Sequence, residues 1–130
     1  MPGFETGLAG KVAIVTGGSE GIGKATARLL YQQRAHVVIC ARRPDVLNAA
    51  AQEIEASGAG GRILAVPADV TRPEDIQRVV DTTVETFGGI DILVNNAGTA
   101  MRGPFLEQTD ERIAEDLDLK LFAAIRFSRL

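Results

Sequence analysis

Short apolar runs alternate along the chain with stretches in which apolar residues recur every three or four positions. The runs are rich in β-branched side chains and predict buried strands at 12–16, 37–40, 63–66 and 90–94. The helical spacing predicts helices that begin near residues 22, 44 and 73, and a last helix from about 109 to 125. Because strands and helices alternate, the pattern predicts an α/β fold with a mostly parallel sheet.

The same spacing selects the side chains that should face the sheet. In the first helix these are Ile22, Thr26, Leu29 and Leu30. Thr71 is predicted to cap the third helix, with Pro73 in its first turn, and Gly88 to end it. The inward residues of the later helices are Val46, Leu47, Ala50 and Ile54, then Ile76, Val80, Thr83 and Phe87, then Ile113, Leu117, Leu121, Ala124 and Ile125.

Right-handed crossovers make a doubly wound, Rossmann-type sheet the natural arrangement of these elements. We expect the strand order 3-2-1-4 and one dinucleotide-binding domain over residues 1–130, cut before a catalytic segment. In such a sheet, ligands bind at the carboxyl ends of the strands. The polar and glycine-rich motifs of this chain all follow predicted strands.

Composition narrows the class of protein. The chain has 130 residues, of which 45% are hydrophobic and 24% charged, as in soluble globular proteins. The net charge of −3 argues against nucleic-acid and anionic-membrane partners, and no apolar run could span a bilayer. Residues 1–10 do not resemble a signal peptide, so we expect a cytoplasmic protein. Cys40 reads as a buried small hydrophobe, and His36 has no nearby partner, so neither a disulfide nor a metal site is expected.

The turn after the first strand carries the strongest chemical signal. Its sequence, Thr16 to Gly23, reads T-G-G-S-E-G-I-G and lies between an apolar strand and an amphipathic helix. Few Cβ atoms and a helix N-terminus suit the close approach of a diphosphate. A nucleotide-hydrolysing P-loop does not fit, because Ala25 stands where that motif has a Mg²⁺-binding hydroxyl.

The spacing T-G-x-x-x-G-x-G resembles that of the short-chain dehydrogenase/reductase family, and three further segments are similar to its motifs: 8–11, 68–70 and 95–98. The resemblance implies that Asp69 and Val70 meet the adenine. It also implies that a cofactor diphosphate lies on Gly17, Ser19, Gly21, Ile22 and Gly23, and a ribose along Asn96, Ala97 and Gly98. The alternative is that Asp69 bonds its own turn and that the asparagines are ordinary turn residues.

The end of the second strand bears on the choice of cofactor. An acid there would bind both ribose hydroxyls and select NAD, but the chain has Arg42 and Arg43. Guanidinium groups match a 2′-phosphate, so NADP(H) is favoured over NAD(H). Many NADP-preferring members also carry a basic residue before the middle glycine, where this chain has Glu20. The alternative is that the two arginines are solvated loop charges.

The resemblance implies catalysis by a serine and by a tyrosine with a lysine four residues later. The sole tyrosine, Tyr31, is followed at that spacing by Ala35, Ser128 lies on the last predicted helix, and no catalytic residue is assigned. Lys120 stands where the family usually has a supporting asparagine, and its role stays open. We therefore expect the cofactor-binding half of an oxidoreductase that acts on a carbonyl or alcohol substrate and forms a homo-oligomer when full length. The alternative is a shortened, non-catalytic protein that binds a nucleotide or a partner.

Overall fold

The computed structural model describes residues 7–96, which form a parallel sheet of four strands with helices on both faces. The strands are β1 (Val12–Thr16), β2 (His36–Ala41), β3 (Ile63–Pro67) and β4 (Ile92–Val94), in the order β3-β2-β1-β4. The helices are α1 (Gly21–Gln32), α2 (Pro44–Ala56) and α3 (Pro73–Phe87). The predicted fold class and strand order are confirmed. The predicted last helix lies outside the described residues.

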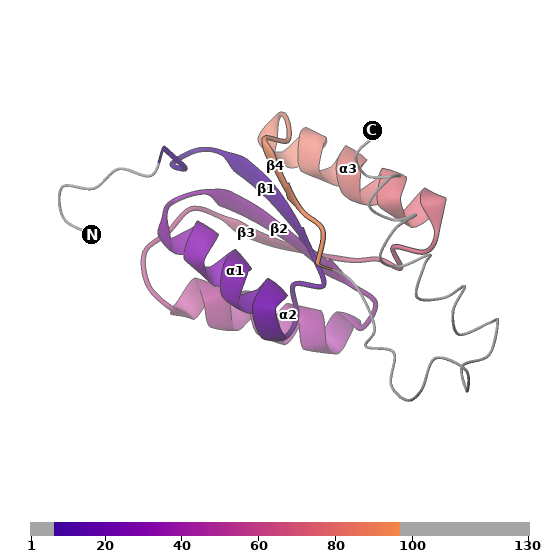
Figure 1. The fold of residues 1–130 in the computed structure, drawn as a ribbon, viewed down its shortest axis with the longest axis horizontal. Helices are drawn as coiled ribbons and strands as arrows, with labels where there is room; N and C mark the ends of the chain where they lie inside the picture. The colour runs from indigo at the N-terminus through magenta and orange to yellow at the C-terminus, as the bar shows by residue number, and fades with distance from the viewer. Residues whose placement is uncertain (1–6, 97–130) are drawn as a thin grey trace, which may run out of the picture.

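Helices α1 and α2 cover one face of the sheet, and α3 covers the other (Figure 1). Alternate residues of the central strands supply the two cores: Val37 and Ile39 pack with α1 and α2, whereas Val38 and Cys40 pack with α3. Strand β1 is buried along its whole length. Burial on both faces explains why the central strands read as continuous apolar runs rather than as alternating patterns.

The path of the chain reverses direction once in the sheet. The connections through α1 and α2 step from β1 to β2 to β3, and the connection through α3 returns to the far side of β1. Because the return changes both direction and sheet face, all three crossovers have the same hand. The reversal leaves a switch point between the carboxyl ends of β1 and β4, where doubly wound sheets bind ligands.

Helix α1 presents to the sheet a face that only partly matches the predicted one: Leu30 packs against the core as predicted, but Ile22 and Leu29 do not. The Ile22 and Leu29 side chains are 78% and 62% exposed, whereas Gly23, Ala27 and Tyr31 are buried. A Cβ atom at Gly23 would collide with the carbonyl oxygen of Gly17. Close packing against the turn therefore selects small residues, which a hydrophobic pattern does not detect. The inner faces predicted for α2 and α3 are confirmed by the burial of Leu47, Ala50, Ile54, Ile76, Val80 and Thr83.

The start of α3 is also built differently from the prediction. Pro73 occupies the first turn as predicted, but Arg72 is the N-cap residue and its side chain makes no capping hydrogen bond. The predicted cap, Thr71, donates its hydroxyl and its backbone N–H to Asp69 Oδ1, at 2.6 and 2.9 Å. Asp69 competes for this threonine because its carboxylate lies two residues earlier, within reach of both donors.

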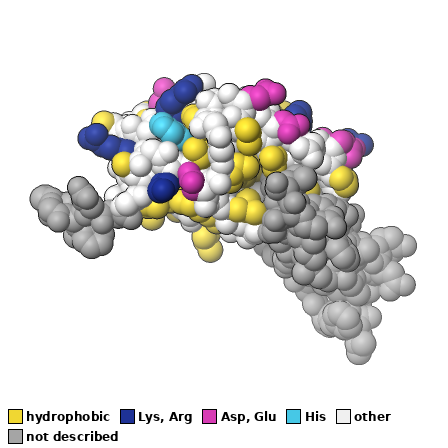
Figure 2. Space-filling model, turned by 90° about the horizontal axis from the view of Figure 1, so that it is seen from above, with side chains coloured by type: hydrophobic (Ala, Val, Ile, Leu, Met, Phe, Trp, Pro, Cys, Tyr) yellow, Lys and Arg dark blue, Asp and Glu magenta, His cyan; other side chains and the backbone are white. Residues whose placement is uncertain are grey.

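The described surface is mixed in character. Figure 2 shows hydrophobic side chains gathered in the middle of one face, with acidic and basic side chains around them. Cys40 is buried as predicted, and burial raises the pKa of its thiol to about 12. The His36 ring stacks on Phe87, with ring centroids 5.1 Å apart. Within residues 7–96, no helix is long and apolar enough to cross a membrane.

Candidate functional site

The polar motifs that follow the four strands meet along one edge of the sheet. Parallel register aligns the strand ends, with Thr16 beside Cys40 and Ala41 beside Pro67. Backbone hydrogen bonds extend this alignment into the loops: Gly17 N donates to Cys40 O and Ala68 N donates to Ala41 O, both at 2.9 Å. The segments that begin at residues 17, 42, 68 and 95 therefore lie side by side.

The glycine turn requires glycine for two physical reasons. Gly17 and Gly21 have φ of +66° and +57°, in the left-handed region that other residues rarely adopt. Gly18 and Gly23 permit close packing, because a Cβ at Gly18 would lie 2.6 Å from Ile39 Cγ2 and one at Gly23 would collide with Gly17 O. By contrast, no atom lies within 4 Å of a Cβ placed on Gly21, so that side of the turn is open.

The N-terminus of α1 fits the diphosphate predicted to bind there. Its N-cap residue, Glu20, is extended and makes no side-chain capping hydrogen bond, and the first turn contains no acid. The first N–H groups of a helix lack partners within the helix and carry partial positive charge, which favours an anion. Ser19 is half-buried beside them. Ile22, in the first turn of α1, is exposed.

Thr16 and Asn96 connect the glycine turn to the end of β4. The backbone N–H of Asn96 donates to Thr16 Oγ1 at 2.9 Å, and that hydroxyl donates to Val94 O at 3.3 Å. The Asn96 side-chain amide donates to Gly17 O at 3.4 Å. Asn96 thus holds the sheet edge together, whereas its neighbour Asn95 is exposed. Sequence reasoning missed Thr16, although a polar residue at the end of an otherwise apolar strand was the available signal.

Arg42 and Arg43 follow β2 directly and both are exposed. Arg43 is the N-cap residue of α2 and makes no side-chain capping bond. Within residues 7–96, no carboxylate lies within salt-bridge distance of either guanidinium. The pair therefore places positive charge beside the glycine turn without a salt bridge to any carboxylate of residues 7–96.

The Asp69 side chain accepts hydrogen bonds from its own loop and is half-buried, so part of it is accessible to a ligand. Its Oδ1 accepts the two hydrogen bonds from Thr71, as in the alternative interpretation of this residue. Its other oxygen accepts no hydrogen bond within the described part of the chain. Partial burial raises the pKa of Asp69, but the bonds from Thr71 and the charges of Arg42 and Arg72 outweigh it and lower the pKa. Val70 is buried.

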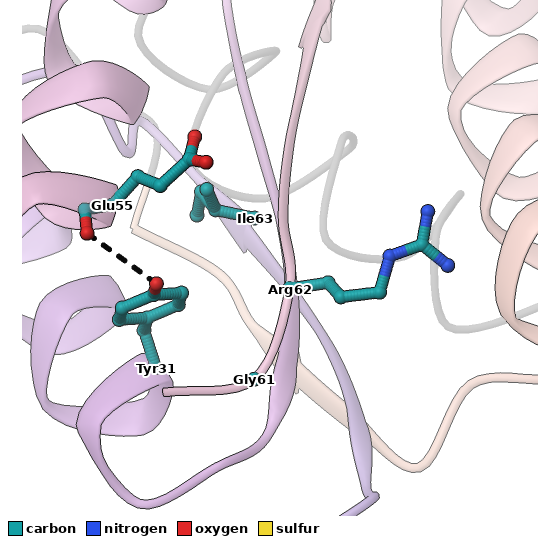
Figure 3. A pocket seen from close by; sticks show the side chains of 5 residues that line it. All are labelled: Tyr31, Glu55, Gly61, Arg62 and Ile63. Carbon is teal, nitrogen blue, oxygen red and sulfur yellow. Dashed lines mark hydrogen bonds between the residues drawn. The ribbon is translucent and has the colours of Figure 1, made fainter. Parts of the chain in front are cut away.

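Tyr31 lies away from this edge. Its ring lines a small cavity of about 150 Å³ with Glu55, Gly61, Arg62 and Ile63, where β3 begins (Figure 3). The tyrosine hydroxyl donates to Glu55 O at 3.5 Å, and the Arg62 side chain points away from it. This placement agrees with leaving Tyr31 out of the candidate site. The remaining predicted site residues, Ala97 and Gly98, lie outside the described residues, as does Lys120, whose role was left open.

Comparison with known proteins gives matches along almost the whole chain. A model of the short chain dehydrogenase family matches residues 11–130. A fatty acyl-CoA reductase of Mycobacterium tuberculosis is 38% identical over 124 residues, which are 94% of this chain and 42% of the relative. Tropinone reductase-like protein 1 of Erythroxylum coca is 43% identical over 91 residues, 70% of this chain and 32% of the relative.

A solved structure is similar to this chain in both fold and sequence. The crystal structure of L-sorbose reductase from Gluconobacter frateurii, complexed with NADPH and L-sorbose, superposes with a TM-score of 0.90 at 41% identity. The match covers 97% of this chain and 48% of that one, so this chain spans about half the length of the reductase. On the family match, the sequence identities and the shared sheet topology, the chain belongs to the short-chain dehydrogenase family.

Proposed function

We propose that this chain is the cofactor-binding half of an NADP(H)-dependent oxidoreductase. The observation that carries the proposal is the exposed Arg42–Arg43 pair at the end of β2, where no carboxylate is available to bind two ribose hydroxyls. A guanidinium binds a phosphate through paired, charge-assisted hydrogen bonds. The similarity to a reductase crystallised with NADPH supports the same cofactor.

In this proposal the diphosphate lies against the open side of the glycine turn. Gly17, Ser19, Gly21, Ile22 and Gly23 supply backbone and hydroxyl contacts at the start of α1. Asp69 accepts a hydrogen bond from the adenine amino group, and the Val70 backbone borders the ring. Asn96 and the adjoining Ala97 and Gly98 border the ribose on the nicotinamide side.

The bound dinucleotide would carry the hydride: its reduced nicotinamide would donate one to a carbonyl carbon of a small-molecule substrate, or its oxidised nicotinamide would accept one from an alcohol carbon. Residues 1–130 form the cofactor-binding part of the domain, and the proton donor belongs to the remainder of the complete protein. The lengths of the relatives support this division, since the chain covers 42% and 48% of two of them.

Direct titration tests the cofactor assignment. The complete protein is titrated with NADPH and with NADH, followed by the change in nicotinamide fluorescence. Because the proposed site holds the 2′-phosphate by charge-assisted hydrogen bonds, we expect NADPH to bind at least about tenfold more tightly than NADH. Equal affinities, or tighter binding of NADH, would overturn the proposal.

A further inference from the structure

A third arginine, Arg72, lies beside the predicted adenine site, three residues after Asp69. Arg72 is the N-cap residue of α3, and its side chain is 64% exposed. Its Nε atom lies 3.7 Å from Glu74 Oε1, and the Glu74 side chain is also exposed. Exposed pairs at such a distance hold their partners weakly. The guanidinium can therefore be drawn to a more highly charged anion.

The backbone fixes Arg72 relative to Asp69. Arg72 N donates to Asp69 O at 3.0 Å and closes a tight turn. The two bonds from Thr71 to Asp69 Oδ1 hold the same turn from inside. Asp75 Oδ2 accepts a 2.8 Å hydrogen bond from Asp69 N and ties the turn to the first turn of α3. These hydrogen bonds therefore fix the backbone of Arg72, and with it the Cα atom from which the side chain extends.

Arg42 follows the neighbouring strand, β2, and lies near the same turn. The pairing of Ala41 with Pro67, and the bond from Ala68 N to Ala41 O, bring the end of β2 next to this turn. Both guanidinium groups act electrostatically on the Asp69 carboxylate and help to lower its pKa. Asp69 is thus influenced by two cations that come from different connections, one after β2 and one after β3.

We propose that Arg72 is a second cofactor-specificity residue, which together with Arg42 attracts the 2′-phosphate of NADP(H). The inference rests on the proposed function. The glycine turn carries Glu20, an exposed acid at the N-cap of α1, whose charge opposes a phosphate. A cation after β3 offsets that acid and leaves the start of α1 to the diphosphate.

The test uses nucleotides without a nicotinamide ring, so that the readout is independent of catalysis. The complete protein and its Arg72→Ala variant are titrated calorimetrically with 2′,5′-ADP and with 5′-AMP. We expect the variant to bind 2′,5′-ADP about five- to tenfold more weakly and 5′-AMP within about twofold of the wild type, because only the former carries the 2′-phosphate. Arg72→Lys keeps the charge and should retain most of the preference.

Arg34→Asn is the charge-matched control. Arg34 is exposed in the turn before β2, at the far edge of the sheet, and its φ of +68° is one that asparagine tolerates. This variant should bind both nucleotides as the wild type does. Thermal unfolding of each variant checks that the fold is retained, since the Arg72 side chain makes no capping bond.

The outcomes separate this inference from the proposed function. Equal weakening of both nucleotides by Arg72→Ala would mean that Arg72 stacks on the adenine, and would overturn the assignment to the phosphate. A preference for 2′,5′-ADP that survives Arg72→Ala unchanged would overturn this inference and leave the proposed function standing. A wild-type protein without that preference would overturn both.

Discussion

The backbone N–H of Asn96 donates a 2.9 Å hydrogen bond to Thr16 Oγ1, across 80 positions of sequence. The same hydroxyl is buried and donates to Val94 O. One side chain thus satisfies a donor and an acceptor at the switch point between β1 and β4. A valine of similar shape would fill the space and leave both groups without that partner.

We therefore predict that Thr16→Val destabilises the protein by about 1–3 kcal/mol, the cost of burying polar groups without partners. Chemical denaturation of the complete protein measures the change. Thr82→Val is the matched control, because Thr82 is half-buried on α3 and no hydrogen bond of its hydroxyl is seen within residues 7–96. Similar free energies of unfolding for the two variants would contradict the proposed role of the Thr16 hydroxyl.

Gly23→Ala tests the close contact between α1 and the glycine turn. The added Cβ would collide with Gly17 O, and the Asn96 side chain lies close by, so we expect a loss of about 1–3 kcal/mol from overpacking. Gly89→Ala is the control, because its Cβ would meet no atom within 4 Å and its φ is not positive. A Gly23→Ala variant with the same free energy of unfolding as Gly89→Ala would show that the glycine turn can shift to accommodate the added Cβ without loss of stability.

Arg42→Ala tests the main contact proposed for the 2′-phosphate. Removal of a charge-assisted pair should weaken NADPH binding by about 1.5–3 kcal/mol and change NADH binding little. Fluorescence titration of the complete protein with each cofactor measures the two losses, with Arg34→Asn again as the charge-matched control. Losses of equal size for the two cofactors would exclude a specific contact with the phosphate.

Cys40 should be inert in the folded protein. Its side chain is fully buried between β2 and α3, and burial raises its pKa to about 12, so little reactive thiolate forms at neutral pH. We expect negligible labelling of Cys40 by a thiol reagent until denaturant unfolds the domain. Mass spectrometry of peptic fragments identifies the labelled position. Rapid labelling under native conditions would contradict the buried environment.

The charge of Asp69 predicts a specific dependence on pH. Since its pKa is lower in the folded than in the unfolded chain, the ionised form stabilises the fold above the unfolded pKa of about 3.9. That contribution is lost as the pH falls through the lower, native pKa. Asp69→Asn keeps an acceptor for Thr71 but removes the charge, so its free energy of unfolding should fall less steeply than that of the wild type below about pH 4. Parallel curves would contradict the shift.

The sequence pattern predicted the strands well and the inward face of the first helix only in part, for related physical reasons. Strands buried on both faces are continuous in apolar residues, so β1 was predicted to the residue, as Val12–Thr16. Helix α1 reaches the sheet through Gly23 and Ala27, whose small size matters more than their hydrophobicity. β4 begins later than predicted, at Ile92, and Asp91 just before it bonds Val12 through both backbone and carboxylate.

The candidate site was partly predictable because its motifs lie at the ends of strands. Spacing alone indicated the glycine turn and the arginines after β2. It could not indicate the hydrogen bonds of Thr16, which join residues far apart in sequence, nor that Arg72 and Arg42 act on the same carboxylate. Both depend on strand register and on how one turn is held, and local sequence does not encode either.

The groups that shape this edge and the groups proposed to choose its ligand differ in burial. Thr16 and Gly23 are buried, whereas Arg42, Arg43 and Arg72 are exposed. Arg43 and Arg72 are the N-cap residues of α2 and α3, and neither side chain makes a capping hydrogen bond. Substitutions of exposed side chains usually change stability by less than about 0.5 kcal/mol. Cofactor preference and foldability can therefore evolve almost independently here. A laboratory attempt to change the cofactor preference proposed here can substitute the arginines while the glycine turn is left unchanged.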